Sequence, residues 1–357
     1  MRILELYAGI GGMHYAFQES MADGTVVSSI DINTVSNEVY QHNFPMTPNI
    51  CKSIESSTIQ DIMKLEVDCI LMSPPCQPFT RQGLKQGSAD NRCASLLHVL
   101  KLIPYIKTLK YVLLENVKGF ESFEVRNDTI VCLENSDFNY KEFILSPHQF
   151  GIPNSRHRYY LIAKKKGLNF IFSDSSLATS IPEDVRKLLP QKMNKFSSAI
   201  NSAALPTFDS MNCFPIKHYL EDNVDSKYLI PISFLIKRGN LLDIRTPDST
   251  GSCCFTKAYR HYAEGTGSVL ARFDDPKLKE KIQDLKKNPD EEKERNLQNL
   301  NLRYFTPKEI SRLMCFPEHF EFPSTTTDMQ KYRLLGNSIN VHVVSILIHL
   351  LSLNSFK

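Results

Sequence analysis

The chain has 357 residues, a formal net charge of +3 and a pI of about 8.3. Hydrophobic residues make up 42% and charged residues 23%, a composition that excludes a disordered or fibrous protein. The length suits one large domain plus a smaller one. No apolar run approaches about eighteen residues, so we expect no membrane partner.

Cysteine usage bounds the chemistry further. The nine cysteines are an odd number and form no C-x-x-C pair, which argues against a disulfide framework and against a zinc site. We therefore expect a reducing compartment and no metal. The small positive charge permits an anionic partner without requiring one.

The chain opens with a predicted strand at residues 3–8, which leaves no basic and apolar leader to be cleaved. The strand ends in Gly9-Ile-Gly11-Gly12 and a helix follows at residues 13–21. A second strand, residues 25–30, ends in Asp31, which lies 19 residues after Gly12. Glycines at a strand-to-helix turn, followed about 20 residues later by a carboxylate, indicate a cofactor that contains adenosine.

Helices are predicted at residues 33–43 and 59–65, and the next strand, residues 69–72, ends abruptly at Ser73-Pro-Pro-Cys76. Proline cannot continue a sheet ladder, so the strand stops and presents a thiol on a rigid turn. Most cysteines are small core residues. The flanking prolines favour a nucleophile at Cys76 instead.

Polar residues also follow the next strand. The glycine-rich loop at residues 81–92 is either a lid or a passive loop, and a helix is expected at 95–102. The strand at 111–114 ends in Glu115, at the sheet edge expected for the glycine turn, Asp31 and Cys76. Two further strands are predicted at 141–145 and 158–163. Arg156 and Arg158, at alternate positions of an extended segment, should point the same way.

From about residue 164 the pattern changes, and residues 173–250 suggest a second domain of irregular structure. Aromatic and basic residues alternate at 259–262, which suits nucleic acid. Residues 277–299 read as two solvated helices, Thr306 is an expected N-cap, and the apolar helix at 341–353 should return to the first domain. We therefore expect a catalytic domain at 1–170, a target-recognition domain at 171–320 and a returning segment at 321–357.

Six ordered motifs resemble those of the cytosine-5 methyltransferase family. They are residues 4–12, Ser73-Pro-Pro-Cys76-Gln-Pro-Phe, Glu115-Asn-Val, and residues 149–158, 303–317 and 336–338. Cys254-Phe-Thr and residues 263–269 are similar to the eukaryotic branch that methylates aspartate transfer RNA. The resemblance implies a Rossmann-like class I methyltransferase fold, α/β with a mixed sheet and a smaller target-recognition domain.

The resemblance also implies an activity. S-adenosylmethionine would donate a methyl group to carbon 5 of an anticodon-loop cytosine, position 38 of tRNA-Asp, and leave S-adenosylhomocysteine. Cys76 would attack carbon 6, Glu115 would protonate ring nitrogen 3, and Arg156 or Arg158 would lower the pKa of the thiol. The base that removes the carbon 5 proton stays unidentified. A monomer in the cytoplasm, and also the nucleus, is expected.

Residues are carried over by motif. Expected substrate contacts are Cys254, Phe255, Thr256 and Lys257. Expected cofactor contacts are Ile10, Gly11, Gly12, Asp31, Ile54, Glu55, Ser73, Ser95 and Ser338. One departure is Ser53-Ile54, where many DNA enzymes carry Asp-Ile, so adenine recognition should rely on Ile54 and Glu55.

Three alternatives remain. A DNA (cytosine-5)-methyltransferase with weak activity would use the same chemistry on DNA, whereas Cys254-Phe-Thr favours RNA. A catalytically silent nucleic-acid-binding protein would be expected to have lost Cys76, Glu115 or the glycine turn, and all are intact. An NAD-binding protein would need a third glycine where His14 stands.

Overall fold

A computed structural model describes residues 1–75, 93–172, 177–190, 213–273, 275, 277–287, 290–299 and 301–353. Its main feature is a seven-stranded sheet of order β3-β2-β1-β4-β5-β7-β6. Strands β1 to β5 pair in parallel, and β7 runs antiparallel to both of its neighbours, so the expected mixed sheet is confirmed. The strands are β1 Arg2–Leu6, β2 Thr25–Asp31, β3 Asn49–Cys51, β4 Cys69–Met72, β5 Tyr111–Val117, β6 Phe138–Leu145 and β7 Arg158–Lys165.

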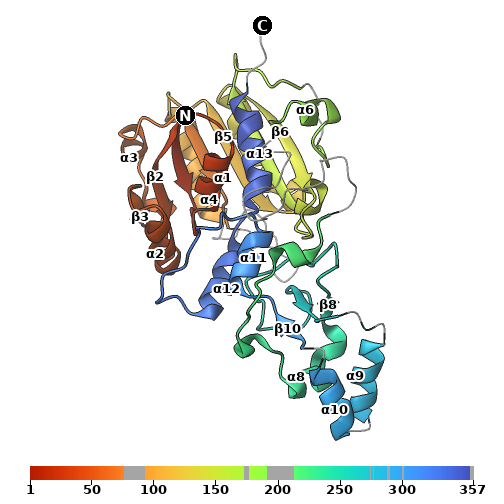
Figure 1. The fold of residues 1–357 in the computed structure, drawn as a ribbon. Coiled ribbons are helices and arrows are strands. Elements are labelled where there is room, and N and C mark those ends of the chain that lie inside the picture. The colour runs from red at the N-terminus through yellow and green to blue at the C-terminus, as the bar shows by residue number, and fades with distance from the viewer. Residues whose placement is uncertain are drawn as a thin grey trace.

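Helices cover both faces of this sheet (Figure 1). One face carries α1 Gly12–Glu19, α2 Thr34–Asn43 and α13 Val341–Ser352, and the other carries α3 Ile59–Met63, α4 Ala94–Leu102 and α5 Glu124–Asn135. Helix α5 was not predicted. It buries only a narrow stripe, Val125, Thr129, Ile130 and Leu133, among polar residues.

Strand β5 is longer than expected. It continues through Glu115 to Val117 because β7 pairs with it along its whole length, with Glu115 opposite Tyr160 and Val117 opposite Arg158. The prediction that the strand ends at Leu114 was therefore wrong. Glu115 is held within the ladder and not on a loop beyond it.

The register of the strands places their polar ends together. Leu6 at the end of β1 lies opposite Ile30 on β2 and Met72 on β4, and Met72 lies opposite Leu114 on β5. Because β7 is antiparallel, its first residue, Arg158, reaches the same edge. This edge is where open α/β sheets bind their ligands.

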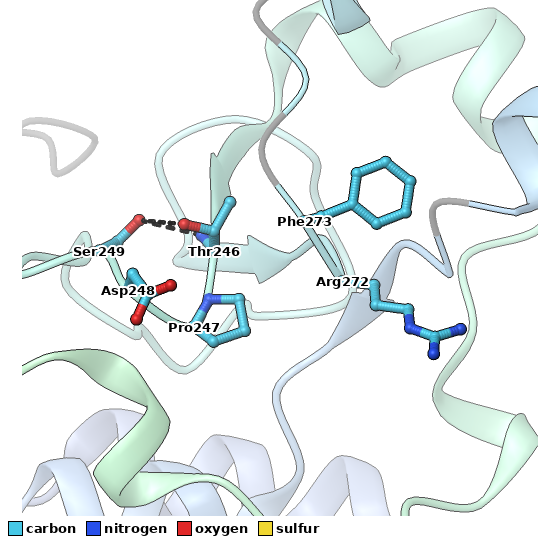
Figure 2. Close-up of a pocket in the computed structure, with 6 residues that line it drawn as sticks. All are labelled: Thr246, Pro247, Asp248, Ser249, Arg272 and Phe273. Atoms are coloured by element: carbon cyan, nitrogen blue, oxygen red, sulfur yellow. Dashed lines mark hydrogen bonds between the residues drawn. The ribbon is translucent and has the colours of Figure 1, made fainter.

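A smaller body lies beyond the sheet (Figure 1). Its strands are β8 Asp243–Arg245, β9 Ser268–Leu270 and β10 Arg303–Tyr304, and its far end holds α8 Ile232–Arg238, α9 Leu278–Lys287 and α10 Glu291–Gln298. The pair α9 and α10 is not fully solvated, since Ile282 and Leu285 are buried. A hollow of about 430 Å³ at the ends of β8 and β9 is lined by Thr246, Pro247, Asp248, Ser249, Arg272 and Phe273 (Figure 2).

The last segments return to the large sheet. They comprise α11, which spans Pro307–Leu313, α12, which spans Asp328–Asn337, and α13. The short helix α6, Glu183–Lys187, comes earlier in the chain, after β7. In α13, His342 Nδ1 lies 2.6 Å from Glu19 Oε1 and His349 Nδ1 lies 2.9 Å from Ser20 O. The stretch Asp328–Ser352 is long and apolar enough to cross a membrane. However, 83% of an apolar 18-residue part of it is buried inside the protein, as in the core helix of a globular protein.

Helix α11 begins at the N-cap predicted from the sequence. Thr306 accepts a hydrogen bond from the Glu309 amide, and the Glu309 carboxylate accepts one from the Thr306 amide at 2.9 Å. That carboxylate is fully buried and also binds the Arg303 guanidinium at 2.7 and 2.8 Å and the Glu221 amide at 3.1 Å. Glu309 thus ties three segments together.

We predict that Glu309→Ala lowers the free energy of unfolding by about 3–5 kcal/mol, because Arg303, whose side chain is only 13% exposed, is left without its charged partner. Glu318→Ala is the matched control, since Glu318 pairs with Arg312 at 2.8 Å but is half exposed. Its loss should cost less than about 1 kcal/mol. Urea unfolding of both variants measures the difference, and equal losses would contradict the role assigned to Glu309.

Candidate active site

A cavity of about 560 Å³ opens at the polar edge of the main sheet. Its lining includes ends of β1, β2, β4 and β5, the start of β7, and the segment that joins α12 to α13. The hollow of Figure 2 brings together one arginine and one aspartate. The larger cavity gathers the carboxyl groups of Glu5, Asp31, Glu55 and Glu115 with Arg156 and Arg158, which makes it the candidate site.

The glycine turn after β1 forms one wall. Gly11 has φ +82°, and a Cβ at this position would lie 2.4 Å from the Phe44 ring, so only glycine fits. Helix α1 begins at the next residue, and Ile10 and Gly12 line the cavity. Gly11 itself faces Phe44 and is not among the lining residues.

Asp31 is held rigidly at the end of β2. One carboxylate oxygen accepts the Gly9 amide and the other accepts the Asn33 amide, both at 2.8 Å. Its carboxylate therefore has a fixed place beside the start of α1. Ile54 and Glu55 lie in a short 3-10 turn on the same cavity, where the Ser53 hydroxyl hydrogen-bonds to Glu55.

Glu115 and Arg158 form an ion pair in the cavity. Arg158 Nε lies 3.4 Å from Glu115 Oε1, and both side chains are largely buried. Burial raises the pKa of Glu115, while Arg158 and then Arg156 act to lower it. The raised pKa favours a carboxyl group that keeps its proton and can donate it.

The turn that follows β4 reaches the same cavity. Ser73, Pro74 and Pro75 line it, and Asn116 Nδ2 donates to Pro74 O at 3.3 Å. Cys76 and the loop at residues 81–92 lie outside the described residues. The described part of this wall therefore ends at Pro75, the residue that directly precedes Cys76.

Arg156 is a buried clamp between distant segments. Its guanidinium donates to Phe255 O and Gly336 O, both at 3.1 Å, and to Ser338 O. It also donates to the Cys254 sulfur at 3.4 Å. Burial lowers the pKa of Arg156, with Arg158 as the next cause. Most of its hydrogen-bonding capacity is directed at the cavity walls.

Most of the residues expected at the site line the cavity. Within the segment 254–257, some residues reach the cavity and others pack elsewhere. Lys257 lines the cavity, whereas Phe255 is 2% exposed and packs on Tyr259 and Phe305. Cys254 contacts the arginines, and the Thr256 amide donates to Thr266 O. Expected residues on the cavity wall are Ile10, Gly12, Asp31, Ile54, Glu55, Ser73, Ser95, Glu115, Arg156, Arg158, Lys257 and Ser338.

The suggestion that residues 259–262 form a nucleic-acid surface is wrong for Tyr259. Its ring is buried and its hydroxyl donates to Ser268 O at 2.6 Å. Arg260 donates to Lys227 O, and its guanidinium lies over the rings of Tyr228 and Tyr304. Within this stretch the most exposed aromatic side chain is Tyr262.

Glu5, a buried carboxyl group that lines the cavity, was not predicted from the sequence. Tyr40 donates to Glu5 Oε2 at 3.1 Å, and His14 Nδ1 lies 2.9 Å from the same hydroxyl. Burial raises the pKa of Glu5 to about 8 and lowers that of His14 to about 4. A carboxylate inside an otherwise apolar strand was the available signal. Other lining residues that were not predicted include Tyr7, Ile32, Asn33 and Asn116.

No group of three or more His, Cys, Asp or Glu side chains that could hold a metal occurs in the described part of the chain.

Comparisons with known proteins agree over nearly the whole chain. The family described as C-5 cytosine-specific DNA methylase matches residues 1–352. A Mus musculus protein named tRNA (cytosine(38)-C(5))-methyltransferase is 44% identical, covering 98% of this chain and 93% of that protein. A solved structure of Spodoptera frugiperda DNMT2 superposes with a TM-score of 0.83 at 40% identity, covering 98% of this chain and 99% of that one. A Dictyostelium discoideum protein, 39% identical over 98% of this chain and 94% of its own, is named DNA (cytosine-5)-methyltransferase.

We predict that Glu5→Gln changes how stability depends on pH. The folded-state pKa of about 8 exceeds the ordinary 4.5, so the contribution of Glu5 to stability is complete below 4.5 and is lost as pH rises to 8. Glutamine does not titrate. The free energy of unfolding of the variant, relative to that of the wild type, should therefore increase as the pH rises from 4.5 to about 8, by up to about 1.4 kcal/mol per pH unit. Urea unfolding at pH 5 and pH 7 tests this, and a constant difference would contradict it.

We also predict that Gly336→Ala separates two cavity walls. An added Cβ would lie 2.2 Å from the Lys257 nitrogen and from the Thr256 carbonyl carbon, and backbone cannot yield cheaply. The expected loss is at least about 1–3 kcal/mol in the free energy of unfolding. Gly251→Ala is the control, because nothing lies within 4 Å of its added Cβ. Thermal unfolding compares the two, and a neutral Gly336→Ala would refute the close approach.

Proposed function

Since this chain belongs to the C-5 cytosine-specific DNA methylase family, we propose that it methylates carbon 5 of a cytosine in transfer RNA. The observation that carries the proposal is the Glu115–Arg158 pair, which lies on the same cavity as Asp31 and the start of α1. An acid for the base and a carboxylate suited to ribose hydroxyls thus share one space. The proposed nucleophile, Cys76, directly follows the lining residue Pro75.

The cavity fits S-adenosylmethionine by the chemistry of its lining. Asp31, with both oxygens already fixed by backbone amides, can accept from ribose hydroxyls, and Ile32 and Ile54 offer apolar contact for a purine. Ile10, Gly12, Ser73, Ser95 and Ser338 line the rest of the expected path. When bound, this cofactor supplies a methyl group on a positively charged sulfur, and therefore an electrophilic carbon.

The residues of the chain would prepare the cytosine to accept that methyl group. The Cys76 sulfur forms a bond to carbon 6, and Glu115 gives its proton to ring nitrogen 3, so negative charge does not build up on the ring. Carbon 5 then takes the methyl group. A base takes the carbon 5 proton, which re-forms the double bond between carbons 5 and 6, breaks the sulfur–carbon 6 bond and regenerates the thiolate, and ring nitrogen 3 returns its proton to Glu115. Arg158 orients Glu115 throughout, at 3.4 Å.

Transfer RNA is supported as substrate by the names of the similar Mus musculus protein and its relatives, which specify cytosine 38. A target base must leave its stack to reach the cavity, and that costs less in an RNA loop than in a duplex. The exposed Lys257 at the cavity is available to a phosphate. tRNA-Asp is the specific substrate that we propose. Monomeric action, in the cytoplasm and nucleus, stays a prediction from the sequence.

DNA is the second candidate substrate, because the similar Dictyostelium discoideum protein is named for it. The same groups would act on a cytosine in DNA, so the proposed chemistry does not discriminate between the two. Parallel assays must therefore decide the substrate.

The deciding experiment follows methyl transfer from labelled S-adenosylmethionine to total tRNA and to duplex DNA. We expect label in tRNA that Cys76→Ala abolishes and that Glu115→Gln reduces by about 10²–10⁴-fold, the usual contribution of a general acid. Cys51→Ala, which removes an exposed cysteine from β3, is the control and should be fully active. Label in DNA alone would overturn the substrate, and label that survives in Cys76→Ala would overturn the nucleophile.

A further inference from the structure

Cys254 lies between the two arginines of the candidate site. Arg156 Nη1 donates to its sulfur at 3.4 Å and Arg158 Nη2 at 3.8 Å. The two guanidinium groups come from alternate positions of one segment, and the cysteine comes from a loop almost 100 residues later. Neither the proposed attack on carbon 6 nor the proton donated by Glu115 uses this thiol.

The charges around this cysteine need an additional anion. Arg156 is buried and Arg158 is largely buried, and Arg158 acts on Arg156 as a like charge. Glu115 is the carboxyl group that pairs with Arg158, and it is the group required to carry a proton. Tyr160, the other titratable group close to all three, has its pKa raised by burial and is neutral. With Glu115 protonated, the two guanidinium charges would be uncompensated.

We propose that Cys254 is a positioning residue whose thiolate offsets one of the two positive charges shared by Arg156 and Arg158 and so holds Arg158 in place beside Glu115. The geometry favours a thiolate, because two charged donors are directed at one sulfur and a charged acceptor binds them more strongly. The neighbouring guanidinium groups outweigh burial and hold the pKa of Cys254 below its ordinary value. In a neutral thiol, the proton would point to Phe255 O at 3.8 Å and leave both arginines with a weak acceptor.

The proposal gives Cys254 a task other than the substrate contact implied by the resemblance. It acts through Arg158 on the proton of Glu115. Removing the thiolate leaves Glu115 as the nearest anion for both arginines, and their attraction then lowers its pKa. Glu115 would lose its proton at a lower pH, and the acid would be missing when the base needs it.

A spectroscopic test does not depend on activity. At neutral pH the thiolate absorbs in the ultraviolet, and Cys254→Ser should remove one thiolate equivalent from the spectrum. The matched control is Cys253→Ser, since Cys253 is the preceding residue, interacts with Asp243 and Arg245, and has a pKa raised by burial. Burial also raises the pKa of Cys69, Cys132, Cys213 and Cys315, so these four contribute little. An unchanged spectrum in Cys254→Ser would overturn the proposal.

A kinetic test rests on the proposed methyl transfer. Cys254→Ala should lower kcat by about 10–100-fold, as loss of a group that orients a reacting residue commonly does, and should shift the alkaline limb of the pH profile to lower pH. Binding of S-adenosylhomocysteine should stay within about twofold, because Arg156 keeps its three carbonyl contacts. Cys254→Ser, which keeps the size of the side chain without the charge, should show the same shift of the limb.

The outcomes separate the two proposals. A wild-type chain that methylates neither tRNA nor DNA, while Cys254→Ser still loses a thiolate, would defeat the proposed function alone. An active wild type with an unshifted pH limb in Cys254→Ala, or with the same shift in Cys253→Ala, would defeat the positioning role and leave the function intact.

Discussion

The site depends on one buried cation, Arg156. A guanidinium group taken out of water costs several kcal/mol unless its donors are satisfied, and here three carbonyl oxygens and one sulfur accept from the two terminal nitrogens, while Nε has no partner among the described residues. Those acceptors belong to the loop that contains Cys254 and Phe255 and to the segment 336–338 that precedes α13. The cost of leaving the cation unsatisfied therefore selects a single arrangement of segments that are far apart in the chain.

The close approach of these segments has a steric counterpart. At Gly336 the backbone of residues 256 and 257 passes so near that no side chain could be accommodated. The cation attracts the two carbonyl-bearing segments, and the missing Cβ lets them meet. Lys257 and Ser338, one on each segment, consequently line the same cavity. The wall is thus set jointly by electrostatics and by the absence of one methyl group.

Local patterns predicted the parts of the site that local physics determines. The strand at residues 69–72 matches β4, because prolines end it, and the cap at Thr306 is a contact between neighbours in the chain. Asp31 could be found because a carboxylate directly follows a buried strand. Helix α5 could not be predicted, since its buried stripe is narrow. The burial of Phe255 could not be predicted either, because Phe305, which packs on its ring, lies about 50 residues away in the chain. The two arginine contacts of Cys254 cross nearly 100 residues, a distance over which no spacing rule operates.

The direction of one strand explains why the binding cavity and the reacting groups coincide. In a wholly parallel sheet, the residues that precede a strand would lie at the edge opposite the ligand site. Strand β7 runs antiparallel to β5, so Arg158 comes to lie opposite Val117, at the edge where Asp31 and Glu115 already lie. Arg156, two residues earlier, then points to the walls while Arg158 points to Glu115. One reversal of direction therefore lets a single segment both build the cavity and place a charge beside the acid, which no parallel strand at this position could do.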